Sequence, residues 1–204
     1  MSKKEEDIIV LTPAFRVSFP NVFKPRAAFD GQEATYNIQM LFPKNADDIP
    51  EKLRQFGTDL TAVKKAMAQA CREEWGEKEK WPTFKHKAIR DGEEKSDLDQ
   101  YKGMHFINSK SKFQPGVVDR QRNEITDPEL FYPGCWARAT LKVYTYDNKF
   151  GAGVQLGLQS LQFLMDGESF SNKRNAKDDF EAIEGFDDDA FSDDSNGAAD
   201  YDDF

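Results

Sequence analysis

Cysteine and long apolar runs are scarce in this 204-residue sequence. Cys71 and Cys135 are the two cysteines, and their number and separation favour free thiols in a reduced, cytoplasmic protein over a disulfide. The sequence has no apolar run of the roughly 18 residues that a membrane-spanning helix needs. Its start, Met-Ser-Lys-Lys-Glu-Glu-Asp, lacks the apolar segment of a secretory signal. The sequence therefore predicts neither a membrane protein nor a disulfide-stabilised one.

The residue patterns of metal centres and catalytic sites are also missing. His86 and His105 are the two histidines, and neither combines with a cysteine in a zinc-binding spacing. There is no Walker loop, nucleophile elbow or HExxH motif. The carboxylates that precede residue 178 form no recognisable acid–base pair. The sequence therefore predicts no metal, no cofactor and no enzymatic activity.

Basic residues are absent from the last 27 residues, 178–204, which carry twelve acidic side chains. The whole chain has 28 basic and 37 acidic residues, so residues 1–177 keep 28 basic and 25 acidic ones, a net charge of +3. A mildly basic body thus precedes a strongly anionic tail. Such a tail can imitate a nucleic-acid backbone and compete for a cationic groove, or it can simply keep the protein soluble. The terminal aromatic residue, Phe204, favours a functional tail.

Composition divides the chain into three parts. We expect a folded domain at residues 1–168, a polar linker at 169–177 and a disordered acidic tail at 178–204. The apolar content of 38% is low for a globular chain, partly because the tail dilutes it. A single domain of roughly 150–180 residues is still large enough to bury a core.

Alternation of apolar and polar residues predicts a domain made mainly of β-strands. Residues 8–19 form an expected strand interrupted at Pro13, with Phe15, Val17 and Phe19 on one face. Further strands are expected at 34–42, 104–113, 117–122, 135–146 and 151–165. In the last of these the alternation slips near Ser160, which indicates a β-bulge or a bend.

One long amphipathic helix is expected after the second strand. Asp48 suits its N-cap, Pro50 its first turn and Glu51 a capping-box spacing. Apolar residues then recur mostly every three or four positions up to Gly76, where the helix should end. Residues 77–103 are charged and irregular, and we expect a loop-rich segment there with one short element. The predicted fold class is therefore α+β, mainly β with one long helix.

The strand at 135–146 has two different faces. The first is small and aliphatic, typical of a core face. The second alternates aromatic rings with cations, and it carries Trp136, Arg138, Lys142, Tyr144 and Tyr146. Single-stranded nucleic acid binds to such a combination, because bases stack on rings while Lys and Arg neutralise phosphates. The alternative is a second buried face, with the rings packed under the long helix.

Other candidate DNA contacts are scattered along the chain. The strand at 104–113 places Phe106, Lys110 and Lys112 on one face, where Phe106 is either a stacking platform or a core residue. The remaining candidates are cations expected in loops, each of which can also be ordinary surface. They are Lys85, Lys87, Arg90, Arg120 and Arg122.

Several short motifs, in this order, resemble a family of tailed-phage single-stranded DNA-binding proteins, long catalogued as a domain of unknown function. The resemblance spans roughly residues 15–181. The motifs are Val22-Phe-Lys-Pro, Leu41-Phe-Pro-Lys, Ile89-Arg-Asp-Gly, Phe106-Ile-Asn-Ser, Gly116-Val-Val-Asp-Arg-Gln-Arg, Asp127-Pro-Glu-Leu-Phe-Tyr-Pro-Gly-Cys-Trp-Ala-Arg-Ala, Gly157-Leu-Gln-Ser-Leu-Gln, Asp166-Gly-Glu and Asp178-Asp-Phe.

This resemblance implies an OB-fold, a five-stranded barrel with insertions, that coats single-stranded DNA during phage replication or recombination in the cytoplasm of the bacterial host. It also implies that the tip formed by Asp202, Asp203 and Phe204 binds phage or host replication proteins and competes with DNA. An OB barrel usually has its helix between the third and fourth strands. Only two expected strands precede the helix here, so a short strand near residues 23–29 is a candidate for the missing one. The strand at 135–146 would then lie beside the binding groove.

The leading hypothesis is a sequence-independent single-stranded DNA-binding protein whose tail folds over the groove until DNA displaces it. The alternative is a single-strand annealing or recombination mediator, which would have to hold two strands. A third hypothesis is a module whose tail mimics DNA to inhibit a nuclease, although the basic body argues against it. A homo-oligomer is compatible with all three, and the sequence does not decide the oligomeric state.

Overall fold

The structure is a computed structural model, which describes residues 7–27, 29 and 31–170. Most of the predicted linker and the whole acidic tail, including Asp202, Asp203 and Phe204, lie outside the described residues. The motif at Asp178 also lies outside them. The prediction of a mainly β fold with one long helix is confirmed within the described part of the chain.

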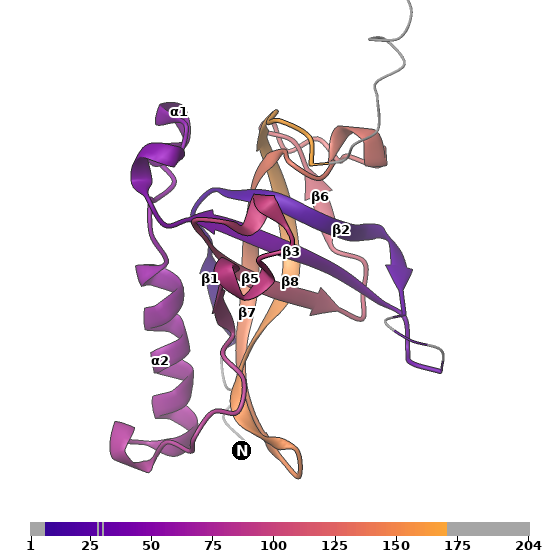
Figure 1. The fold of residues 1–204 in the computed structure, drawn as a ribbon. Helices are drawn as coiled ribbons and strands as arrows, with labels where there is room; N and C mark the ends of the chain where they lie inside the picture. The colour runs from indigo at the N-terminus through magenta and orange to yellow at the C-terminus, as the bar shows by residue number, and fades with distance from the viewer. Residues whose placement is uncertain (1–6, 28, 30, 171–204) are drawn as a thin grey trace, which may run out of the picture. The chain divides into compact units, whose positions relative to one another are not determined.

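The described residues form one sheet whose strands follow the order β4-β5-β3-β2-β7-β8-β6, with β1 paired to β7 (Figure 1). Five strands are long and three are short. The long ones are β2 (Phe15–Arg26), β3 (Thr35–Pro43), β5 (Met104–Ser111), β7 (Trp136–Asn148) and β8 (Gly151–Met165). The short ones are β1 (Ile8–Leu11), β4 (Ile89–Asp91) and β6 (Gly116–Val118). Every pairing between these strands is antiparallel except that of β6 with β8.

The expected long helix is divided into two. Helix α1 covers Glu51–Arg54 and helix α2 covers Thr61–Trp75. Gly57, with a φ of 101°, ends α1 by donating its N–H to the carbonyl of Arg54. The chain there takes a left-handed conformation that glycine adopts at little cost. Apolar spacing alone therefore overestimated the helix, although its predicted end at Gly76 is confirmed.

The predicted N-cap of that helix is also wrong. Asp48 is the last residue of a short 3₁₀ helix, Ala46–Asp48, which is capped by the side chain of Asn45. Pro50, the N-cap of α1, makes no side-chain capping bond. Instead of one short element, residues 77–103 hold β4 and three 3₁₀ helices. These are Lys78–Lys80, Gly92–Lys95 and Asp99–Tyr101; a further one covers Pro128–Leu130.

The first expected strand is interrupted at Pro13 as predicted, and its two halves become β1 and β2. Strand β2 runs on to Arg26, so the strand expected near residues 23–29 is its continuation. Phe15 and Val17 are fully buried, but Phe19 is 46% exposed. Its φ is 44°, and the pairing with β3 shifts register after Ser18. The prediction that Phe19 shares one face with Phe15 and Val17 is therefore wrong.

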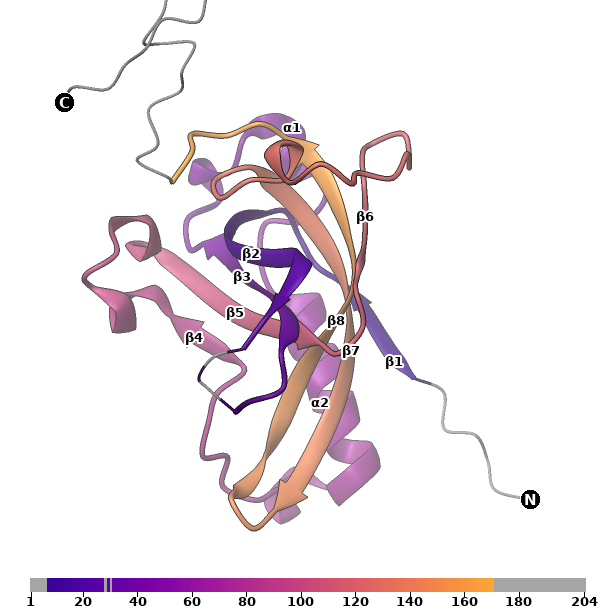
Figure 2. The ribbon, with the colours of Figure 1, turned by 90° about the vertical axis from the view of Figure 1, so that its right-hand side faces the viewer.

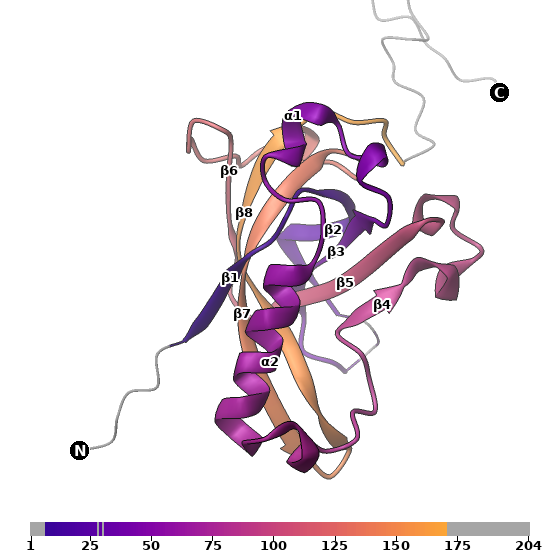
Figure 3. The same cartoon turned by 90° about the vertical axis from the view of Figure 1, so that its left-hand side faces the viewer.

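The β7–β8 hairpin confirms the predicted alternation. Ala137, Ala139, Leu141 and Val143 are buried. Thr140 pairs with Ser160 whereas the next residue of β7 pairs with Leu158, which places a bulge where the alternation of β8 slips. Helix α2 packs along this hairpin (Figure 3). Both cysteines are buried and free, as expected, and burial raises the pKa of the Cys135 thiol to about 12.

Strands β2, β3 and β5 project from the hairpin on the side opposite α2 (Figure 1). Strand β2 pairs with β7 at Phe15 and Arg16 only, after which it diverges. On the other side, the buried hydroxyl of Ser109 in β5 donates to the carbonyl oxygen of Leu156 in β8. The projecting strands therefore contact both strands of the hairpin, β7 through β2 and β8 through β5. In Figure 2, β5 and β4 run towards the hairpin.

No helix in the described residues is long and apolar enough to cross a membrane. The described residues also contain no cluster of three or more His, Cys, Asp and Glu side chains that could hold a metal ion.

Candidate nucleic-acid interface

Two adjoining hollows lie along the projecting strands. The first, of about 550 Å³, is lined by Phe19, Asn21, Arg26, Ala27, Gln32, Thr35, Asn37, Ile38, Gln39, Asn108, Ser109, Lys110 and Gln155. The second, of about 640 Å³, is lined by Lys85, His86, Lys87, Ala88, Arg90, Glu94, Asn108, Val154 and Gln155. Asn108 and Gln155 belong to both linings, so the two hollows adjoin each other. We call the two together the groove.

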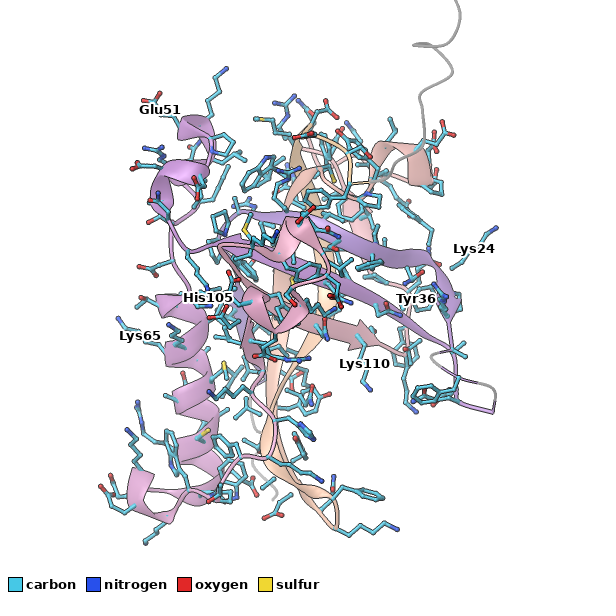
Figure 4. The ribbon with its side chains drawn as sticks, viewed as in Figure 1. Lys24, Tyr36, Glu51, Lys65, His105 and Lys110 are labelled. Carbon is cyan, nitrogen blue, oxygen red and sulfur yellow. The ribbon has the colours of Figure 1, made fainter. Side chains whose placement is uncertain are left out.

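The groove is strongly cationic. Its lining contains five basic side chains and one carboxylate, that of Glu94. Arg90 donates to Glu94 at 2.7 and 2.9 Å, and this contact lowers the pKa of the carboxyl. Among the described residues the other four cations form no ion pair. They are Arg26, Lys85, Lys87 and Lys110; Figure 4 shows Lys110 pointing away from β5.

Some cations elsewhere on the surface are held in ion pairs, although others, such as Lys52 and Lys65, are also unpaired among the described residues. Lys44 pairs with Asp91 at 2.7 Å, and Lys102 pairs with Asp99 at 2.6 Å. A surface that gathers like charges without carboxylate partners attracts anions. The groove is therefore suited to a polyanion such as a nucleic-acid backbone.

The wall of the groove is polar and organised. The side-chain amide of Asn21 donates to the side-chain oxygen of Asn37 at 3.0 Å, which holds the two strands β2 and β3 together past the bulge. Gln39 accepts a hydrogen bond from Lys95 at 2.7 Å. Amide side chains offer both donors and acceptors, so this wall can contact any base without demanding one sequence.

Aromatic rings near the projecting strands are more exposed than sequence reasoning predicted. Phe19 lines the groove, while Phe29 and Phe113 are 72% and 82% exposed. Phe29 and Phe113 were missed because each was placed at the end of an expected strand, whereas in the structure each lies in a bend beyond the end of β2 or β5. The signal that could have found them is an aromatic residue close to a cation in a turn, namely Phe29 three residues after Arg26 and Phe113 directly after Lys112.

The structure brings four of the predicted DNA-binding residues together and separates the others. Lys85, Lys87, Arg90 and Lys110 all line the groove. They come from β4, β5 and the segment before β4, so no single stretch of sequence contains the set.

Trp136 and Arg138 occupy a different part of the molecule. Trp136 is 5% exposed and packs in a core cluster with Ile49 and Leu53 at α1. The Arg138 guanidinium lies 4.7 Å from the centre of the Phe56 ring, and its Nε donates to the side chain of Gln162 at 2.8 Å. The alternative of a buried face fits this end of β7, so we do not assign Trp136 as a base platform.

The other end of that face is partly exposed but does not line the groove. Lys142 pairs with Asp7 at 2.6 Å. The rings of Tyr144 and Tyr146 lie over glycines of β8, since a Cβ on Gly157 would stand 3.2 Å from Tyr144 and one on Gly153 within 2.6 Å of Tyr146. These tyrosines cover backbone that has no side chain of its own.

The remaining predicted contacts also lie outside the groove lining. Phe106 is fully buried against Tyr101, so it is a core residue and its ring cannot stack on a base. Lys112 pairs with Glu33 at 2.9 Å. Arg120 and Arg122 lie in the turn after β6, which is organised by the carboxylate of Asp119.

The sequence model described as "Enterobacter phage Enc34, ssDNA-binding protein" matches residues 8–191, which is most of the chain. The chain belongs to the Enc34 single-stranded DNA-binding protein family. This finding confirms the resemblance that the short motifs indicated over residues 15–181. A relative with the name putative protein p50, from Acyrthosiphon pisum secondary endosymbiont phage 1, is 29% identical over 181 residues, covering 85% of this chain and 89% of that protein.

Solved structures of two phage single-stranded DNA-binding proteins share the fold. The single-stranded DNA-binding protein from bacteriophage Enc34, solved in complex with ssDNA, has a TM-score of 0.61 at 22% identity and covers 84% of this chain and 97% of its own. The single-stranded DNA-binding protein gp2.5 of bacteriophage T7 has a TM-score of 0.51 at 15% identity, covering 89% of this chain and 98% of its own. At such identities the similarity establishes the fold alone.

Proposed function

We propose that this member of the Enc34 family binds single-stranded DNA without sequence preference and holds it in the groove. The observation that carries the proposal is the set of four unpaired cations that line the groove next to an exposed Phe19. Lys and Arg side chains neutralise phosphates, and exposed rings stack on unpaired bases. The protein would act inside the host cell, on DNA exposed during phage replication or recombination.

Anisotropy titrations with labelled oligo-dT, oligo-dA and a hairpin duplex, each at two salt concentrations, test this function. We expect both single strands to bind tightly and the affinity to fall as salt rises, because binding releases counterions from the phosphates. The duplex should bind more weakly, since its bases are already stacked. Absence of binding to either single strand at low salt, for the full chain and for residues 1–177 alike, would refute the proposal.

Removal of residues 178–204 should tighten binding. We propose that the twelve carboxylates of this segment compete with DNA for the cationic groove. Their loss changes the net charge from −9 to +3, so the gain should be greatest at low salt, where screening is weakest. Titrations of residues 1–177 beside the full chain measure the gain. Equal affinities at low salt would show that the tail does not compete.

The same segment is proposed to serve a second purpose. When DNA occupies the groove, the displaced tail becomes available to other proteins, and Asp202, Asp203 and Phe204 offer charge and an apolar ring. We propose phage or host replication proteins as the partners.

A further inference from the structure

The backbone at Phe19 is unusual. Its φ of 44° lies in the left-handed region, which few residues other than glycine adopt. The shift of register between Ser18 and Asn21 places Phe19 in an irregular part of β2, where its ring leaves the core and lines the groove. Exposing a large apolar ring in a strained backbone conformation does not stabilise the fold. Such an arrangement suggests contact with a ligand.

Lys95 lies against this ring. Its Nζ is 5.9 Å from the centre of the Phe19 ring. It is also 4.7 Å from the ring of Tyr101 and 5.2 Å from that of Phe106. Burial lowers the pKa of Lys95, and the neighbouring charge of Arg90 lowers it further. Among the described residues Lys95 has no carboxylate partner, so an incoming anion would supply the missing negative charge.

Gln39 links this lysine to the groove wall. Its Oε1 accepts hydrogen bonds from Lys95 Nζ, at 2.7 Å, and from the hydroxyl of Tyr101. Two donors on one oxygen fix the orientation of the amide. The Nε2 group then points away from both donors, and no residue of the described part of the chain accepts from it. Because Gln39 lines the groove, its Nε2 can donate to a ligand there.

We propose that Phe19 and Gln39, which line the groove, form one nucleotide subsite together with Lys95, which contacts both of them. The Phe19 ring stacks on a base, Lys95 binds the adjoining phosphate, and Gln39 donates through Nε2 to the same nucleotide. The inference rests on the proposed function and adds to it a defined contact. Lys95 reaches the site from the 3₁₀ helix Gly92–Lys95, a segment in which sequence reasoning expected no DNA contact.

The contacts of Phe19 and Lys95 can be separated with two oligonucleotides of equal length, oligo-dT and a fully abasic strand. Phe19→Leu should weaken binding to oligo-dT by roughly fivefold to a hundredfold, the usual effect of losing one stacked base. The same variant should bind the abasic strand as the wild type does. Lys95→Met should weaken binding to both strands and make the dependence of log affinity on log salt shallower by about 0.7, the value of one phosphate contact on a single strand.

Matched controls separate the subsite from the protein surface in general. Phe150→Leu removes a ring that is 72% exposed, against 46% for Phe19, and that does not line the groove. Lys65→Met removes a cation from α2. Neither should change affinity for either strand. Phe19→Gly should weaken binding to oligo-dT while keeping or raising the melting temperature, because glycine tolerates the positive φ. A variant that lost binding because it misfolded would instead show both a lower affinity for oligo-dT and a lower melting temperature.

The outcomes distinguish this inference from the proposed function. If the wild type binds oligo-dT and the Phe19 and Lys95 variants bind it equally well, the subsite is overturned and the function stands. If Phe19→Leu weakens binding to the abasic strand as much as to oligo-dT, stacking on Phe19 is overturned. If the wild type and residues 1–177 both fail to bind oligo-dT, the proposed function itself fails.

Discussion

Reversing two charges in the groove, with Lys87→Glu and Lys110→Glu together, is expected to weaken binding to single-stranded DNA by roughly a hundredfold or more at low salt. The groove lining carries five basic residues and one carboxylate. The double variant carries three of each, so the net charge of the lining falls from +4 to zero. Both side chains are exposed and unpaired among the described residues. The fold should therefore be unaffected.

Salt dependence gives the sharper measurement for this variant. Each lost phosphate contact on a single strand makes the plot of log affinity against log salt shallower by about 0.7, so the double variant should differ by about 1.4. Lys52→Glu with Lys65→Glu is the matched control, since it alters the total charge equally but lies on α1 and α2. An equal loss in this control would show that overall charge, and not the groove, determines affinity.

The strands could be predicted because each carries its own pattern. The alternation in β3, β7 and β8 is local, and even the bulge of β8 is visible as a slip of phase near Ser160. The division of the helix was missed because apolar residues keep their spacing through Gly57, and only the left-handed φ of that residue shows the interruption. Phe19 was misassigned for a similar reason. Its residue type continues the alternation of Phe15 and Val17, but its positive φ interrupts that alternation.

The groove could be predicted only in part. Cations in charged segments were recognised as candidates, and Lys85, Lys87, Arg90 and Lys110 prove to share one surface. These four residues lie close together because strands far apart in the sequence pair with each other, and no local sequence pattern predicts such pairing. The cation–aromatic face of β7 was the strongest signal in the sequence. At one end of this face the ring of Trp136 is buried in a cluster with Leu53 of α1, so it is not available to a base.

Some short motifs of the resemblance have a packing explanation in the structure. A Cβ on Gly134 would stand 2.1 Å from the carbonyl oxygen of Glu168, and one on Gly167 would stand 2.3 Å from that of Gly134. Arg16 joins the two segments, donating to the carbonyl oxygens of Gly134 and Glu168 at 2.6 Å each. Two motifs that are weak in isolation thus form one contact, which attaches the end of the described chain to β2.

Gly92 makes the tightest such approach, and Gly92→Ala is expected to destabilise the protein by about 3 kcal/mol or more, the upper range for an overpacked core. A Cβ at this position would stand 1.9 Å from the carbonyl oxygen of Tyr101 and 2.7 Å from that of Met104. Both are backbone atoms, so neither can turn aside. The two 3₁₀ helices that follow β4 would have to separate from each other or from β5.

Thermal unfolding of Gly92→Ala measures the effect. For a domain of this size about 3 kcal/mol corresponds to a fall of roughly 6–12 °C in the melting temperature. Gly116→Ala is the control, because a Cβ there meets nothing within 4 Å and its φ is not positive; it should unfold as the wild type does. The separation of the two segments should also displace Lys95, so surviving folded protein should bind DNA as Lys95→Met does. An unchanged melting temperature would mean that the 3₁₀ helix Gly92–Lys95 does not pack closely against Tyr101 and Met104. The position of Lys95 at the proposed subsite would then lose its structural basis.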